Sequence, residues 1–163
     1  MRGLTPGEIA VLQEAFGDRV DYGTVRLRSG AGRNAAAIAA FRKGNSAITL
    51  GRSLYFRTHY SDDFAEADVF AQSLLHHEIT HVWQYATLGK PRFLARYARE
   101  LAACRFNARA MYRYEEGATR FDDARLEAQA QLIGDYCLVR LIGDEGRQAR
   151  LERNLKGSGF YGL

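Results

Sequence analysis

Apolar and polar positions follow a helical repeat at the start of the chain. Apolar residues recur at a spacing of three or four as far as Phe16, and Thr5 followed by Glu8 is the order typical of a capped helix start. The pattern therefore predicts a short helix over residues 4–16.

A different pattern occupies residues 25–57, where short runs with β-branched and aromatic residues are separated by turn signals rich in glycine, serine and asparagine. Turns this short leave no room for the crossovers that parallel strands need, so we expect a small antiparallel sheet. The predicted strands are residues 25–28, 36–41, 47–50 and 54–57.

The pattern returns to a helical repeat after this sheet. Asp63 and Glu66 can form a capping box, and apolar residues then continue on one helical face to Leu88, where Gly89 ends the helix. Two further helices are predicted, over residues 91–101 or 91–106 and over residues 122–142.

Two segments fit this scheme less well. Residues 107–121 are compatible with a helix or a strand, and the glycine-rich tail from residue 157 is expected to be loosely held. Taken together, the patterns predict an α+β fold in which a small N-terminal antiparallel sheet is followed by a mainly helical region. A length of 163 residues with 47% apolar residues predicts a single domain over residues 1–163.

The net charge of +4 invites a nucleic-acid interpretation, but 19 acidic residues are interleaved with 23 basic ones and no recognition motif accompanies them. We therefore expect no nucleic-acid partner. No run reaches the roughly 18 apolar residues of a membrane-spanning helix, so no membrane partner is expected either. The N-terminus lacks the order of a secretory signal, which predicts a cytoplasmic location. Cys104 and Cys137 form no Cys-x-x-Cys pair and are expected to be free thiols, with a disulfide between them left open.

One motif carries chemistry. Residues 77–81 read His-Glu-Ile-Thr-His, the short metal-binding pattern His-Glu-x-x-His, and they fall well inside a predicted helix. Residues four apart share one helix face, so His77 and His81 can reach the same metal ion while Glu78 projects toward a bound water. Neutral imidazoles suit Zn²⁺, which lowers the pKa of a bound water to about 7 and lets Glu78 act as the general base of peptide hydrolysis.

Coincidence is the alternative explanation, because two histidines and a glutamate also occur on ordinary amphipathic helices. Two observations weigh against it. All four histidines of the chain fall within residues 59–81, and the motif is flanked by apolar residues that would give a metal ion a dry wall. His76 would point away from His77 and would contact substrate or solvent, and Trp83 is expected to pack in the core.

A catalytic zinc usually takes three protein ligands. No histidine follows His81, so the third ligand must be acidic. We choose Glu127, one turn into the last predicted helix, because Ala130 and Gly134 on the same face would allow that helix to pack closely on the motif helix. The candidates are Glu100, Glu115, Glu116, Asp122, Asp123, Glu127 and Asp135.

Other roles stay open at this point. Asp135 fits either a hydrogen bond to a ligand histidine or an ion pair with an arginine. An oxyanion stabiliser is not assigned, and the candidates are Tyr114, Tyr136 and His76.

Residues 76–84, His-His-Glu-Ile-Thr-His-Val-Trp-Gln, and residues 126–130, Leu-Glu-Ala-Gln-Ala, resemble a group of bacterial zinc peptidases. Members are often labelled Vgr-related or occur near phage-tail-like contractile injection systems, including type VI secretion systems. Residues 4–10 and 16–18 also look like that group's N-terminus, so the resemblance spans most of the chain. It implies a zincin-like, gluzincin-type arrangement with His77, His81 and Glu127 as zinc ligands and Glu78 as base.

These observations predict a zinc-dependent metallopeptidase that acts on a peptide or protein substrate. By analogy, an edge strand within residues 47–57 would bind an extended substrate by strand addition. The alternative is a zinc-binding module without turnover that serves binding or assembly in a secretion or phage-tail-like system. Delivery by a specialised secretion system is compatible with both hypotheses, and the presence of Glu78 favours catalysis because a structural zinc needs no base.

Overall fold

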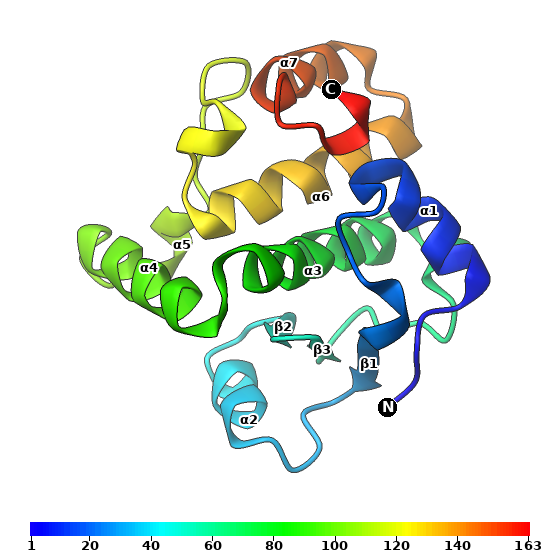
Figure 1. The fold of residues 1–163 in the computed structure, drawn as a ribbon, viewed down its shortest axis with the longest axis vertical. Helices are drawn as coiled ribbons and strands as arrows, with labels where there is room; N and C mark the ends of the chain where they lie inside the picture. The colour runs from blue at the N-terminus through cyan, green and yellow to red at the C-terminus, as the bar shows by residue number, and fades with distance from the viewer.

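Two long helices, α3 (Val69–Leu88) and α6 (Leu126–Ile142), lie side by side through the middle of the molecule in a computed structural model that describes all 163 residues (Figure 1). A small sheet covers one side of α3, and α6 lies along the other. The fold class is α+β, as predicted. The remaining helical elements are α1 (Pro6–Phe16), η1 (Tyr22–Thr24), α2 (Ala35–Arg42), η2 (Phe64–Glu66), α4 (Lys90–Ala103), α5 (Ala108–Met111), η3 (Phe121–Asp123), α7 (Glu145–Leu155) and η4 (Phe160–Gly162).

The first helix forms where the sequence predicts it. Thr5 accepts a hydrogen bond from the Glu8 backbone N–H, and the Glu8 carboxylate accepts one from Thr5, so the capping box is complete. Glu8 is fully buried and pairs with Arg2 at 2.7 Å. These contacts fix the N-terminal segment against the body of the protein.

The sheet departs from the prediction. β2 (Ala47–Leu50) and β3 (Ser53–Phe56) pair antiparallel through the tight turn at Gly51, but β1 (Arg26–Ser29) pairs parallel with β3. The expectation of a wholly antiparallel sheet was therefore wrong for β1. The connection from β1 to β3 is longer than the turns suggested, because it contains both α2 and β2. The strand order β1-β3-β2 leaves β2 at an edge of the sheet.

The predicted strand at residues 36–41 is helix α2. Asn34 caps this helix by accepting a hydrogen bond from the Ala37 N–H at 3.0 Å. Alanine is the strongest helix former, and α2 contains five alanines in the sequence Ala-Ala-Ala-Ile-Ala-Ala-Phe-Arg. Local helix propensity here outweighs the strand-like flanks.

The motif helix starts later than predicted. Asp63 caps only the short turn η2, and Asp68 is the residue that caps α3, accepting hydrogen bonds from the N–H groups of Phe70 and Ala71. The predicted end is correct, since α3 stops at Leu88 before Gly89. The chain then turns directly into α4, which projects with α5 from one end of the α3 and α6 pair (Figure 1).

The C-terminal region is more ordered than expected. Residues 107–121 contain only the short helix α5 before η3, and α7 was not predicted at all. The tail is not loosely held, because Phe160 is fully buried and meets Phe16 edge to face at a ring distance of 5.5 Å. One apolar cluster thus joins α1, the sheet, α3, α6 and the tail. Cys104 and Cys137 are free thiols.

None of the helices combines the length and the apolar character that a membrane-spanning segment requires.

Candidate metal centre

The structure brings together the three residues proposed as metal ligands. His77 and His81 lie one turn apart on α3, and their Nε2 atoms are 3.5 Å and 3.3 Å from the same oxygen, Oε2 of Glu127. One potential ligand atom from each residue lies within 4.8 Å of the others, and all three residues are buried. A single ion can therefore reach all three side chains.

Close packing of α6 on α3 sets this geometry. The Ser73 hydroxyl donates to the Gly134 carbonyl at 2.9 Å, across the two helices. A Cβ atom at Gly134 would lie 3.0 Å from the Ser73 carbonyl oxygen and 3.4 Å from His77 Cβ. Glycine at this position lets α6 approach the turn of α3 that carries the first histidine, as the small residues of α6 predicted.

The surroundings of Glu127 indicate that these three side chains suit a metal ion. Glu127 Oε2 is buried without a hydrogen-bond partner, although buried polar atoms are nearly always paired. Two imidazole nitrogens and a carboxylate oxygen are the donor types that zinc takes in catalytic sites, and three protein ligands leave a position open. The unpaired oxygen between the two imidazoles is thus explained if the site binds a cation.

The electrostatics of the metal-free site follow from the same proximity. Burial alone would raise the pKa of Glu127, but the adjacent His81 and His77 hold it well below its ordinary value. Burial alone would lower the pKa of His81, but the charge of the adjacent Glu127 carboxylate raises that pKa to about 9. The carboxylate is therefore ionised and attracts positive charge to this position.

Gln84 orients the second histidine. Its Oε1 lies 2.8 Å from His81 Nδ1, and its amide nitrogen donates to the Leu126 carbonyl and to Gln129 Oε1. Because an amide oxygen only accepts, His81 donates from Nδ1, and the neutral imidazole then presents Nε2 without a proton to a metal ion. This outer hydrogen bond also ties α3 to the start of α6, where Glu127 lies.

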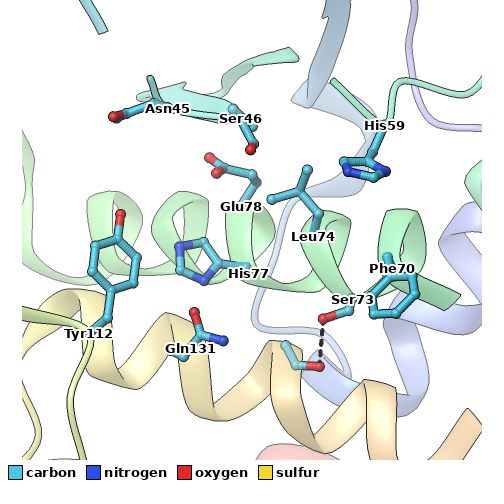
Figure 2. A pocket seen from close by; sticks show the side chains of 12 residues that line it. Asn45, Ser46, His59, Phe70, Ser73, Leu74, His77, Glu78, Tyr112 and Gln131 are labelled. Carbon is cyan, nitrogen blue, oxygen red and sulfur yellow. Dashed lines mark hydrogen bonds between the residues drawn. The ribbon is translucent and has the colours of Figure 1, made fainter. Parts of the chain in front are cut away.

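Glu78 is held by the edge strand. The Thr49 hydroxyl lies 2.6 Å from Glu78 Oε2 and 3.1 Å from the Glu78 carbonyl oxygen. Glu78 and Thr49 are both buried, yet the Glu78 carboxylate faces a cavity beside His77 (Figure 2). The candidate base and the sheet edge are therefore coupled by a direct hydrogen bond.

The cleft has two lobes that meet at His77, Glu78 and Tyr112. The first lobe has a volume of about 330 Å³ and is shown in Figure 2. The second lobe has a volume of about 220 Å³ and contains His81 and Glu127. Both lobes also share Asn45 and Ala47, so the cleft runs beside β2.

Sequence reasoning missed Tyr112. Its ring stacks on His77 at a centroid distance of 5.8 Å, and Figure 2 shows its hydroxyl pointing to the side of the cleft where Glu78 lies. Burial, followed by the charge of Glu127, raises its pKa above the ordinary value, so the phenol keeps its proton. Residues 107–121 carried no clear periodic signal, and no pattern could have placed Tyr112 beside the motif.

The three oxyanion candidates named from the sequence lie elsewhere. Tyr114 hydrogen-bonds Asp135, and Tyr136 donates to Glu152. His76 is buried, with its Nδ1 bonded to the Gln72 carbonyl and its ring stacked on Phe16 and Tyr161. It contacts neither the cleft nor bulk solvent, so the expectation of a substrate-contacting or solvated His76 was wrong.

The structure also shows which groups Asp135 and Trp83 contact. Asp135 forms an ion pair with Arg147 at 3.1 Å, which matches the ion-pair alternative and not a hydrogen bond to a ligand histidine. Trp83 packs edge to face on Phe160 at 4.9 Å as part of the core, as expected.

Fold and site together define a small α+β protein with a buried group of two histidines and one carboxylate that could hold a metal ion. A family model described as the eCIS core domain matches residues 5–89, which is more than half of the chain. The chain therefore belongs to the eCIS core domain family. The matched segment contains His77, Glu78 and His81 but ends before Tyr112 and Glu127.

Two comparisons cover almost the whole chain. The chain is 29% identical over 158 residues to the type VI secretion system spike protein VgrG2b of Pseudomonas aeruginosa. The aligned residues cover 95% of this chain and 15% of that protein. A solved structure of the effector domain of Pseudomonas aeruginosa VgrG2b superposes with a TM-score of 0.68 and 26% identity, over 96% of this chain and 82% of that one. The chain is thus Vgr-related, as the motif resemblance implied, and corresponds to a small part of the spike protein.

Proposed function

We propose that this chain is a zinc-dependent peptidase module associated with a contractile secretion system. His77, His81 and Glu127 would hold the zinc ion, and Glu78 would act as general base. One observation carries the proposal: a buried, unpaired Glu127 oxygen lies between two imidazoles, in a cleft that the Glu78 carboxylate also lines. With zinc bound, these residues would form the zincin-type site that the sequence analysis expects.

Zinc is favoured by the donor set. Two neutral imidazoles and one carboxylate are the ligands of many catalytic zinc sites, whereas calcium and magnesium prefer oxygen donors. When bound, zinc supplies a Lewis acid that polarises a carbonyl and lowers the pKa of water to about 7.

Glu78 is placed to take a proton from an attacking water and to pass it to the leaving amine. Its carboxylate faces the cleft from the turn of α3 that carries both histidines. Thr49 donates to Oε2, so Oε1 remains available for the proton. A base that is fixed on a rigid helix and oriented by a neighbour suits proton transfer at a single position.

Tyr112 would stabilise the oxyanion of the tetrahedral intermediate. It reaches the cleft beside His77 and keeps its proton, so its hydroxyl can donate a hydrogen bond to developing negative charge. We propose Tyr112 for this role instead of the sequence candidates Tyr114, Tyr136 and His76.

β2 would position the substrate. It is an edge strand, and its residues 47–50 line the second lobe of the cleft. An extended peptide can pair with the free edge of a strand through backbone hydrogen bonds, which would place one peptide bond over Glu78. Only β2 meets this condition within residues 47–57, because β3 is the central strand.

A second function rests on the comparisons. Similarity to a spike protein and to its effector domain supports a module of a secretion system, and supports it better than it supports hydrolysis. In that case the metal ion would stabilise the packing of α3 on α6, and the module would bind or assemble without turnover. Both functions use His77, His81 and Glu127 in the same way.

Cleavage of a randomised peptide library separates the two functions. We expect zinc-loaded wild type to cleave peptides, zinc-loaded Glu78→Gln to cleave at least about 100-fold more slowly, and both to hold zinc equally. Equal, slow cleavage by both proteins would exclude Glu78 as base. Full zinc loading without any wild-type cleavage would favour the assembly module.

A further inference from the structure

The two lobes of the cleft differ in chemistry. The lobe in Figure 2 is mainly polar, with Asn45, Ser46, His59, Ser73 and Gln131 among its lining residues. The other lobe is mainly apolar and aromatic. Its wall consists of Ile48, Leu50, Tyr85, Phe93, Leu94 and Tyr97.

We propose that the apolar lobe is a specificity pocket that takes one aliphatic or single-ring aromatic side chain of the substrate. This inference rests on the proposed function, because it assigns the substrate class of the same site. The substrate would be a peptide whose backbone runs along β2, with an apolar side chain on the α4 side of the cleaved bond and a polar or small one on the other side.

The pocket wall is built for apolar contact. Phe93 is buried and stacks on Tyr85 with ring centroids 3.8 Å apart, and it meets His81 edge to face at 6.2 Å. Leu94 lines the same lobe and remains 48% exposed, so its side chain is accessible to a ligand. Ile48 and Leu50 are half-buried and face the same space from β2. An apolar side chain in this lobe would cover surface that water now contacts.

Burial against the apolar wall disfavours acidic side chains in the same lobe. No lysine or arginine lines it, while Glu78 and Glu127 lie at its base. A carboxylate held against the apolar wall would lose its hydration without a lysine or arginine to pair with. The apolar wall therefore discriminates against aspartate and glutamate by desolvation.

The α4 part of the wall lies outside the segment that the family model matches. Phe93, Leu94 and Tyr97 belong to α4, whereas the family model ends at residue 89. Ile48, Leu50 and Tyr85 lie within the matched segment, together with the histidines and the base. A substitution at Leu94 on α4 can therefore change the preferred side chain without replacing a metal ligand.

Leu94→Arg tests the inference, with Leu141→Arg as its matched control. Both leucines are exposed helix residues, at 48% and 45%, but Leu141 lies on α6 and lines a different cavity. The probes are two blocked peptide pools that are identical except for leucine or aspartate at one central position. Cleavage is measured with zinc-loaded wild type and variants, and binding is measured with the same variants in a zinc-loaded Glu78→Gln background.

We expect wild type to prefer the leucine pool by at least about tenfold, and Leu94→Arg to reduce this preference by about tenfold, with Leu141→Arg unchanged. Leu94→Ala should weaken the leucine pool without helping the aspartate pool, which separates lost contact from added charge. Cleavage without a leucine preference, or a preference that Leu94→Arg leaves intact, would overturn the pocket while the proposed function stands.

Binding distinguishes the remaining cases. If no protein cleaves either pool but Glu78→Gln binds the leucine pool selectively and Leu94→Arg abolishes this, the pocket stands and the peptidase proposal fails. If neither cleavage nor binding distinguishes the two pools, the pocket is wrong.

Discussion

Replacing Gly134 by alanine tests how closely α6 must approach α3. The added Cβ would lie 3.0 Å from the Ser73 carbonyl oxygen and 3.4 Å from His77 Cβ, and the first of these distances is too short without a shift of the backbone. Alanine gains about 1 kcal/mol of helix propensity over glycine. Overpacking a close helix contact costs about 1–3 kcal/mol, and we expect this cost to dominate.

Gly146→Ala is the matched control. Gly146 lies in the first turn of α7, and its nearest neighbours would be Asp144 Oδ1 at 3.8 Å and Arg150 Nη1 at 4.0 Å from the new Cβ. The same chemical change there should stabilise the protein by up to about 1 kcal/mol, because only the propensity gain applies.

Urea unfolding of both metal-free variants measures the difference. We expect Gly134→Ala to be less stable than wild type by about 1 kcal/mol, and Gly146→Ala to be as stable or more stable. Zinc titration should show weaker binding, by about tenfold or more, for Gly134→Ala alone, since the shifted contact carries His77. If Gly134→Ala matched Gly146→Ala in stability and bound zinc like wild type, the helices would not need this separation.

Three further changes probe the site. Gln84→Leu removes the hydrogen bond that orients His81, and calorimetry should show zinc affinity falling by about 10–100-fold; unchanged affinity would refute the orienting role. Thr49→Val removes the donor to Glu78, so peptide turnover should fall by about tenfold at unchanged zinc content, whereas a parallel loss of zinc would indicate a structural role instead. The pKa of His81 is raised to about 9 in the metal-free protein, so zinc must displace a proton, and its affinity should rise about tenfold per pH unit from about pH 7 until that pKa is reached. This folded-state pKa lies above the ordinary value of histidine, so protonated His81 stabilises the metal-free protein through its contact with Glu127. The free energy of unfolding should therefore fall as the pH rises through about 9. A zinc affinity or a free energy of unfolding that does not change with pH would contradict the assignment.

Local signals explain which elements the sequence could predict. α1, the end of α3 and the end of α6 carry caps, a helical repeat and a terminal glycine, all of which act within a few residues. The parallel pairing of β1 with β3 depends on residues 27 positions apart, and no local pattern specifies it. α7 was missed because few of its positions are apolar: Leu151 and Leu155 form most of its buried face.

The site residues also differ in whether local sequence could predict them. The spacing of His77 and His81 is a property of one helix and could be read directly from the sequence. Glu127 required a physical argument about small residues on α6, and the structure places it beside both imidazoles. Tyr112 and the α4 wall come from segments without a clear repeat or from long-range packing, so only the structure could bring them to the cleft.

Zinc content measures the central claim most directly. Wild type and Glu127→Ala are loaded with zinc, dialysed against metal-free buffer and analysed by mass spectrometry, with circular dichroism to verify that both are folded. If His77, His81 and Glu127 form one metal centre, wild type retains about one zinc ion per chain and Glu127→Ala retains far less. Folded wild type without zinc, or equal zinc in both proteins, would contradict the three-residue centre.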